Sequence, residues 1–434
     1  MDRSASIERL AGEIQRLPAS VRWLHAQPDV ILALACEKPL VRGPRMCWVD
    51  RFVRLTTSLG IARVSATAVS LVTILATYIR QLAMLRRPQA AHAPFFVGMG
   101  ALREPGLVRQ LEELTGRPVD SLNLFDFRTF FRRRHVGAAL LLKEWLCVWR
   151  EISSELAPAA VGGVARGLPL DYRLSQVLTR SHCYIYARAW FRAQVQANPQ
   201  NNTIGFSTAD DLAYAAVAAG AKAIYLVHGF LARSLIFPDF AEVHCFTSSE
   251  REHFQDRLPQ AKIHLVPPTF RPIVSRRVLA IAGGYLAFQQ VYPCDSLLSW
   301  AQKTNLPIIV RVHPNDHSGY WERFRGQPGI EVEQSSTTFS TFLAQHRPRI
   351  LATWMSTAIF DSLTHGVVPL TLLADSIHTA DVVFPIRHMA LVWPEDRDTL
   401  DLLLDAPDSA VEFAAEAFRK TIDDVPDVIA TSDR

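Results

Sequence analysis

Two histidines in this sequence directly follow strongly apolar segments, where an imidazole could reach a ligand. His313 follows LPIIVRV, with Pro314 ending the predicted strand, and His228 follows AIYLV. At the carboxyl end of a parallel strand an imidazole faces the edge where open α/β sheets bind ligands. His313 could therefore protonate a leaving group, with Arg311 on the same side of its strand, and His228 could accept a proton from a hydroxyl. A structural turn is the alternative for both histidines.

A second set of residues is suited to holding a phosphate. Ser356 and Thr357 follow RILATWM, at the predicted start of the next helix. Free backbone N–H groups, two hydroxyls and the positive end of the helix dipole would meet there. Gly283 and Gly284 follow the apolar segment RVLAIA and would let the backbone approach a ligand closely. A plain helix cap without a ligand is the alternative for the Ser-Thr pair.

Two acidic residues are further candidates for a catalytic base. Asp210 and Asp211 open the predicted helix ADDLAYAAVAAG, where either could take a proton or simply interact with the helix dipole. The aromatic and basic segment FFRRRH, Phe130 to His135, could contact an anionic acceptor or a membrane surface, or be a solvated helix face.

The elements that must position these residues alternate between strand and helix. This rhythm begins near Asn202 and restarts after PPTFRPIVSRR, residues 267–277, which we interpret as a linker between lobes. Alternation of this kind indicates parallel sheets with crossover helices. The sequence therefore predicts an α/β fold of two Rossmann-type lobes with parallel sheets facing a central cleft, plus a helical N-terminal extension.

The predicted domains are four segments of the chain. They are a helical extension at 1–90, an acceptor-side α/β lobe at 91–270, a nucleotide-binding α/β lobe at 278–405, and a C-terminal helix and tail at 406–434. Within the first segment, the apolar stretch 64–79 is shorter than the roughly 20 residues of a membrane-spanning helix. It predicts either a buried core helix or a helix at a membrane interface.

Composition narrows the class of protein further. Of the 434 residues 49% are hydrophobic and 20% charged, which is typical of globular domains and argues against disorder. A net charge of +4 is too small for a dedicated nucleic-acid binder. The six cysteines form no CxxC pair, which favours free thiols in a reducing cytosol over a zinc ribbon or a disulfide scaffold. The N-terminus has no apolar signal-peptide core.

Taken in order, these motifs resemble bacterial GT-B transferases of capsule and wall polymers. That group includes sialyltransferases and polysialyltransferases, capsule Kdo transferases and CDP-glycerol glycerophosphotransferases. The resemblance covers about residues 202–375 and rests on short motifs in matching order: His228-Gly229, His313-Pro314, Ser356-Thr357, Phe360-Asp361 and Pro369. It implies a GT-B-like fold.

The resemblance also implies an activity. It implies a glycosyltransferase that moves a sugar from a nucleotide-activated donor, of the CMP-sialic acid or CMP-Kdo type, to a surface polysaccharide or lipid-linked glycan. His313 would contact the donor phosphate, Ser356 and Thr357 would hold phosphate oxygens, and Asp361 would support the helix or the pocket. Donor binding would also involve Arg311, Pro314, Gly283 and Gly284, and the base would be His228, Asp210 or Asp211.

Such an enzyme would need no cofactor and no tightly bound metal. It would be cytoplasmic, with peripheral contact to the inner face of the cytoplasmic membrane, and would bind no nucleic acid. Three alternatives remain open: a CDP-glycerol-type polyol-phosphate transferase, a non-catalytic GT-B binding or assembly protein of polysaccharide biosynthesis, and a nucleotide-sugar epimerase or hydrolase.

Overall fold

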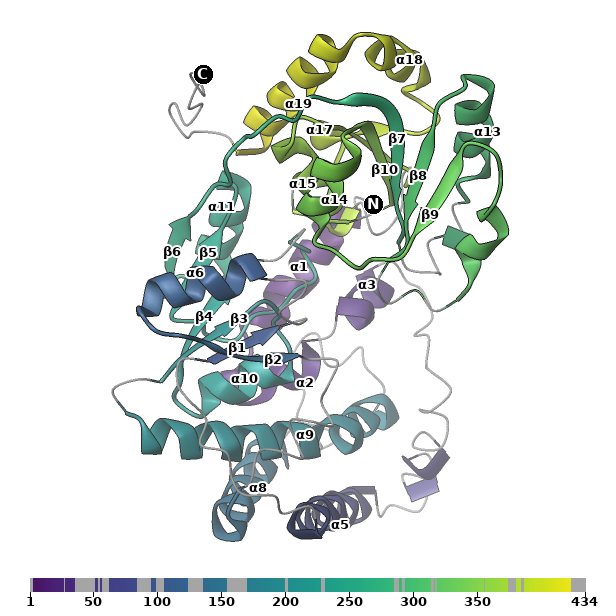
Figure 1. Cartoon of the computed structure of the whole chain (residues 1–434). Helices are drawn as coiled ribbons and strands as arrows, with labels where there is room; N and C mark the ends of the chain where they lie inside the picture. The colour runs from purple at the N-terminus through teal and green to yellow at the C-terminus, as the bar shows by residue number, and fades with distance from the viewer. Residues whose placement is uncertain are drawn as a thin grey trace. The chain divides into compact units, whose positions relative to one another are not determined.

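A computed structural model describes most of the chain and divides it into two compact units. The first unit comprises Met1–Val227, Arg233–His244 and Phe254–His264, and the second comprises His228–Ala232, Cys245–His253 and Leu265–Arg434. Figure 1 shows the helices and strands of both units. The residues that the structure describes are 3–26, 28–35, 51–53, 55–56, 62–83, 95–98, 105–123, 136–153, 170–199, 202–227, 231–284, 289–290, 293–313, 316, 318–354, 356–373, 380–383 and 386–422.

The first unit is built on a six-stranded sheet in the order β2-β1-β3-β4-β5-β6. Every pair whose register is described is parallel. The strand order reverses between β1 and β3, the switch point seen in flavodoxin-like sheets. The strands are β1 (Phe95–Gly98), β2 (Asp120–Asn123), β3 (Thr203–Phe206), β4 (Lys222–Leu226), β5 (Glu242–Cys245) and β6 (Lys262–Leu265).

Crossover helices connect these parallel strands. They are α6 (Pro105–Thr115) between β1 and β2, α10 (Asp211–Ala218) between β3 and β4, and α11 (Ser248–Arg257) between β5 and β6. On α6, Leu107 and Leu111 form a core with Phe96, Ile224 and Leu226 of the sheet. A Cβ at Gly205 would lie 2.6 Å from Leu111, so glycine at this position lets α6 lie close against the sheet.

The first unit contains further helices. They are α1 (Arg3–Gln15), α2 (Ala19–His25), α3 (Pro28–Ala35), α5 (Ala62–Ala83), α8 (Ala138–Ser153) and α9 (Leu170–Ala197). The described part of the predicted extension 1–90 is helical, and contacts group it with the first unit. Among the described residues, no helix is long and apolar enough to cross a membrane.

The second unit is built on a parallel sheet in the order β12-β11-β10-β7-β8-β9. Counted from β7, this is the 3-2-1-4-5-6 order of the Rossmann fold, whose switch point lies between β7 and β10. The strands are β7 (Arg276–Ala282), β8 (Ile308–Arg311), β9 (Ile330–Glu333), β10 (Pro348–Thr353), β11 (Val368–Thr371) and β12 (Leu391–Val392). Together the two sheets confirm the predicted α/β class.

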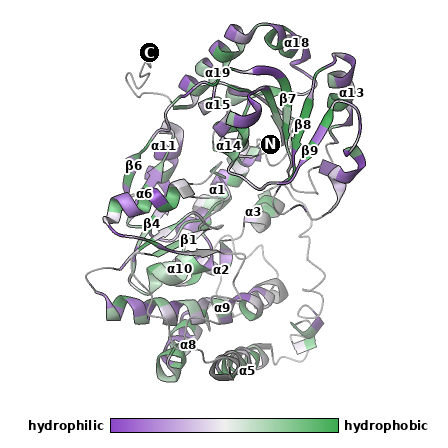
Figure 2. Cartoon of the chain, viewed as in Figure 1, coloured by the Kyte–Doolittle hydropathy of each residue, from purple (hydrophilic) through white to green (hydrophobic). Residues whose placement is uncertain are grey.

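Alternating residues of the central strand β7 face two different cores. Leu279 and Ile281 belong to a core with α13, while Ala280 and Ala282 belong to one with α14. Figure 2 shows the resulting hydrophobic colour along β7 and β8. A strand buried on both faces is apolar at every position, which explains the continuous runs in the sequence. The helices are α13 (Asp295–Lys303), η3 (Tyr320–Phe324), α14 (Phe339–His346), α15 (Ala358–Thr364), α17 (Ile386–Met389), α18 (Arg397–Asp405) and α19 (Pro407–Ile422).

The predicted interlobe linker at 267–277 packs against the second unit. Arg271 N donates to Thr364 O at 2.7 Å, and Ile273 N donates to His365 O at 2.9 Å. The ring of Phe270 lies 5.4 Å from that of Phe418 on α19. β7 begins at Arg276, so the last two residues of the predicted linker belong to this strand.

A buried ion-pair cluster joins α8 to α9 and generates a stability prediction. Glu144 is 1% exposed, and its two oxygens lie 2.8 Å from Nε of Arg188 and 2.5 Å from Nε of Arg192. Replacing it with alanine leaves two guanidinium groups without this counter-charge, so we expect Glu144→Ala to reduce the free energy of unfolding by about 3 kcal/mol. Urea unfolding followed by circular dichroism measures this loss.

Glu322→Ala is the matched control, because Glu322 pairs with Arg325 at 2.8 Å on the surface. An exposed pair contributes little, so this variant should unfold at the same urea concentration as the wild type. Equal, small effects of both substitutions would contradict the role assigned to Glu144.

Candidate functional site

The candidate site of the second unit lies at the carboxyl ends of β8, β7 and β10. Gly283 follows β7, and a Cβ at this position would lie 3.0 Å from the backbone N of His313. A Cβ at Gly284 would lie 3.2 Å from the ring of Trp354, two residues before Ser356. β7 lies between the other two strands, so the glycine pair has His313 on one side and the start of α15 on the other.

A tryptophan that the sequence reasoning missed lies beside the same glycine. Trp321 of η3 is 2% exposed, and its Nε1 would lie 3.1 Å from a Cβ at Gly283. In the described part of the chain this indole N–H has no hydrogen-bond partner. Its ring lies 6.3 Å from that of Trp354, edge to face. No local pattern identifies Trp321, because η3 precedes β9 and reaches β7 only through the sheet order.

The Ser-Thr pair opens α15 as predicted. Ser356 Oγ accepts a hydrogen bond from Ala358 N at 3.3 Å, so this hydroxyl caps the helix. The Thr357 side chain makes no capping bond. Both residues are partly exposed. Their binding of a phosphate stays a prediction, in which the Thr357 hydroxyl is the one that capping does not use.

Arg311 is held beneath α14. Its Nε donates to Ser335 Oγ at 3.0 Å and its Nη2 donates to the carbonyl of Thr337. The guanidinium carbon lies 5.2 Å and 5.4 Å from the ring centres of Phe339 and Phe342. Burial lowers the pKa of Arg311 from its ordinary value. The guanidinium therefore has structural partners, and a contact with the donor stays a prediction.

Asp361 lies on α15 and interacts electrostatically with Arg311. Burial raises the pKa of its carboxyl to about 6, against the lowering effect of the Arg311 charge. An aspartate that is partly protonated near neutral pH is compatible with the supporting role predicted for it.

The two acidic candidates of the first unit follow β3, next to the β1–β3 switch point. Asp210 caps α10, with Oδ1 accepting from Leu212 N at 3.0 Å and Ala213 N at 3.2 Å. Asp211 forms a two-bond ion pair with Arg180. Burial and the charge of Asp211 raise the pKa of Asp210 to about 6. Both residues have structural roles, and the raised pKa of Asp210 is suited to exchanging protons near neutral pH.

Several predicted positions lie outside the described residues. These are His228, Gly229, Pro314 and the segment from Phe130 to His135.

Glu250 is a buried acid that the sequence reasoning did not single out. Its Oε2 accepts from Phe246 N at 2.9 Å and Thr247 N at 3.1 Å, while Thr247 Oγ1 accepts from Glu250 N at 3.1 Å. Burial raises its pKa to about 7. This is a capping box, and the signal Thr-x-x-Glu in TSSE predicts it. The Glu250 carboxylate therefore caps the N-terminus of α11.

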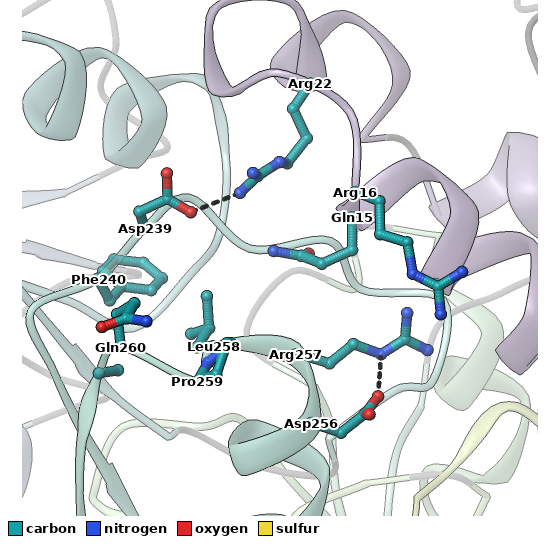
Figure 3. Close-up of a pocket in the computed structure, with 12 residues that line it drawn as sticks. Gln15, Arg16, Arg22, Asp239, Phe240, Asp256, Arg257, Leu258, Pro259 and Gln260 are labelled. Carbon is teal, nitrogen blue, oxygen red and sulfur yellow. Dashed lines mark hydrogen bonds and ion pairs between the residues drawn. The ribbon is translucent and has the colours of Figure 1, made fainter. Parts of the chain in front are cut away.

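A cavity of about 560 Å³ lies in the first unit beside α1 and α2 (Figure 3). It is formed with the segments that precede β5 and β6, at the amino ends of these strands. Two of its arginines form ion pairs: Arg22 lies 2.7 Å from Asp239, and Arg257 lies 2.6 Å from Glu8. The cavity contains none of the predicted site residues, and its walls come from segments more than 200 residues apart in the chain. Its lining includes Gly12, Gln15, Arg16, Phe240, Asp256, Leu258 and Gln260.

Comparison with known proteins finds only structures of low sequence identity and low TM-score. No protein-family model matches the chain, and no curated protein matches it. Among solved structures it is similar to UDP-GlcNAc 2-epimerase from Neisseria meningitidis bound to UDP-GlcNAc, with 10% identity, a TM-score of 0.47 and coverage of 76% of this chain and 94% of that one. It is also similar to UDP-GlcNAc 2-epimerase from Methanocaldococcus jannaschii, with 10% identity, a TM-score of 0.43 and coverage of 72% of this chain and 91% of that one. For the glycosyltransferase SnogD from Streptomyces nogalater the identity is 13%, the TM-score is 0.41 and the coverage is 76% of this chain and 94% of that one. Values this low assign no activity to the chain.

The Asp361 carboxyl generates a prediction of pH dependence. Because folding raises its pKa from 3.8 to about 6, its contribution to stability is full below about pH 4 and is lost as the pH rises through about 6. Asp361→Asn keeps the shape but does not ionise. We therefore expect the melting temperature of Asp361→Asn, relative to wild type, to rise as the pH increases from about 4 to about 7.

Differential scanning calorimetry across this range makes the measurement. Asp256→Asn, at a carboxylate that is 81% exposed, controls for the general effect of removing one negative charge. A difference in melting temperature between wild type and Asp361→Asn that stays constant with pH, or that changes in the opposite direction, would refute the shift.

Proposed function

We propose that this chain is a glycosyltransferase of the GT-B type that binds a nucleotide-activated sugar in its second unit. One observation carries the proposal: Gly283 and Gly284 lie at the switch point of a 3-2-1-4-5-6 sheet, with His313 and the start of α15 on either side. Open α/β sheets bind nucleotides at this point, because the chain diverges in opposite directions and leaves a crevice at the strand ends.

The chemistry assigned to these residues is stabilisation of a leaving phosphate. Glycine at 283 and 284 lets the donor approach the backbone, and the start of α15 offers N–H groups and the Thr357 hydroxyl to phosphate oxygens. His313 would donate a proton or a hydrogen bond to the departing phosphate. Fixed donors aimed at developing negative charge are usually the largest contribution to the rate of such a transfer.

The donor class is proposed from the spacing of the motifs. His313-Pro314 followed by Ser356-Thr357 is similar to the pattern of transferases that use CMP-linked sialic acid or Kdo. The proposed acceptor is a surface polysaccharide or a lipid-linked glycan. A CDP-glycerol-type polyol-phosphate transfer is the alternative, in which the donor carries the same nucleobase.

Among the residues proposed to accept the proton of the acceptor hydroxyl, Asp210 is favoured by its raised pKa, while Asp211 is paired with Arg180.

Peripheral membrane contact is proposed from an exposed apolar face of α5. Its side chains at Val64, Val72, Leu75 and Ile79 are 74%, 64%, 49% and 63% exposed. Their spacing of three to eight residues places them on one side of the helix.

The neighbouring helix α8 also exposes apolar side chains. The helices are joined by the hydrogen bond from Trp145 Nε1 to Ser70 Oγ at 3.2 Å. On α8, Leu142 and Leu146 are 50% and 56% exposed, and Lys143 is an exposed basic residue beside them. An apolar surface with basic neighbours matches the interface of a membrane that contains anionic lipid.

Nucleotide binding tests the proposed donor site. We expect CMP or CDP to raise the melting temperature of the full chain more than UDP, GDP or ADP, because a ligand that binds the native state stabilises it. Thr357→Val and His313→Asn should each weaken this binding about tenfold, or about 1.4 kcal/mol. Isothermal titration calorimetry measures the affinities.

Thr337→Val, which removes an exposed hydroxyl in the same unit, should bind like the wild type. Preference for uridine or guanosine nucleotides would reject the CMP donor. Absence of any nucleotide effect, or wild-type affinity in both site variants, would reject the site itself.

Vesicle sedimentation tests the apolar face. The wild type should bind phosphatidylglycerol vesicles more strongly than phosphatidylcholine vesicles. Val72→Glu combined with Leu75→Glu should reduce the vesicle partition coefficient at least about tenfold, since burying each apolar side chain contributes about 1.5 kcal/mol. Val274→Glu is the control, because Val274 is 83% exposed elsewhere in the chain. Equal binding by all three proteins would exclude this face as the contact.

A further inference from the structure

Three side chains with metal-binding atoms meet on one face of the first sheet. Glu242 and His244 lie two residues apart on β5, and therefore on the same side of this strand, and His264 lies on the neighbouring edge strand β6. Glu242 Oε2 lies 3.9 Å from His244 Nε2 and 3.7 Å from His264 Nε2. The two imidazole rings are stacked with centres 4.7 Å apart.

These distances fit one small metal ion. All three donor atoms lie within 4.8 Å of one another. A tetrahedral zinc ion with bonds of about 2.0–2.1 Å separates its ligand atoms by about 3.4 Å, so the side chains need to move only slightly. Two imidazoles and one carboxylate form a donor set that zinc uses with three protein ligands and one open position.

We propose that Glu242, His244 and His264 bind a zinc ion that ties the edge strand β6 to β5. His264 is 46% exposed and Glu242 is 15% exposed, so the ion would have access from solvent and a fourth position for water. An edge strand lacks a neighbour on one side, and a metal bridge to the next strand would compensate for this.

The residues around His244 leave its Nε2 atom available to a metal ion. His244 Nε2 is buried and has no hydrogen-bond partner among the described residues. Its other nitrogen, Nδ1, lies 3.2 Å from Nε2 of Gln110 on α6, and an amide nitrogen there can only donate to it. Turning the Gln110 amide by half a turn would place its oxygen at this position, where it accepts from Nδ1–H and leaves the Nε2 lone pair of His244 free for the ion.

The carboxylate is held in a similar way. Lys222 Nζ lies 2.7 Å from Glu242 Oε1, while Oε2 is the oxygen nearest the imidazoles. Lys222 thus orients Glu242 without occupying the metal-facing oxygen. Glu242 and Lys222 are the first residues of β5 and β4, so this cluster lies toward the amino ends of the strands. It is therefore distinct from the strand-end positions proposed for the transfer reaction, for which no tightly bound metal is expected.

Zinc titration of the full-length chain, after treatment with a chelator, tests the proposal. We expect about one zinc ion per chain, with a Kd in the micromolar range or tighter, and visible absorption when Co²⁺ is the probe. His264→Ala and Glu242→Gln should abolish this binding. Gln110→Leu, a change at a positioning residue, should weaken it about 10–100-fold.

His346→Ala is the matched control, because His346 Nε2 pairs with Glu333 Oε1 at 3.0 Å in a histidine–carboxylate contact that has no third metal-binding side chain among the described residues. This variant should bind zinc like the wild type. His264 lies on the surface, so His264→Ala should fold, which circular dichroism checks. Absence of saturable zinc binding in the wild type, or unchanged binding in folded His264→Ala, would overturn the proposal.

Discussion

The close approach of backbones at the end of β7 is the constraint on which the second unit depends. Gly283 N donates to Arg311 O at 2.9 Å, and no side chain fits at position 283 without displacing the backbone beside His313 or the indole of Trp321. Because β7 is central and buried on both faces, its end cannot move outward to make room. The absence of a side chain at Gly283 lets the segment after β8 lie directly against the end of β7.

The acidic residues Asp210 and Glu250 fix the beginnings of helices. Both accept hydrogen bonds from backbone N–H groups at helix starts, and burial raises the pKa of each. A capping carboxylate at a strand-to-helix junction is necessarily near the ligand-binding edge of a parallel sheet. Asp210 can therefore cap α10 and also be proposed as the catalytic base, because a helix that follows a strand begins at the ligand-binding edge of the sheet.

The first unit contains helices in addition to those that connect its strands, and a polar cluster at one edge of its sheet. Glu144, Arg188 and Arg192 join α8 to α9, and α5 lies against this pair with an apolar face exposed. At the β6 edge of the sheet, Glu242 and the two histidines replace apolar contacts with polar ones. The proposed membrane contact and the proposed zinc site thus belong to different elements of this unit, the first to α5 and α8 and the second to β5 and β6.

The sequence by itself determined the α/β class, the alternation of strands and helices, and the places of His313, Gly283 and Ser356 at strand ends, because hydrophobic periodicity and helix caps are local signals. Only the tertiary structure decided that β7 lies between β8 and β10, since strand order depends on how both faces of the sheet are covered. That order brought Trp321 beside Gly283 and placed Arg311 beneath α14, and neither contact has a local signal. Likewise, the pairing of β5 with β6 brought His264 to Glu242, although 21 residues separate them in the chain.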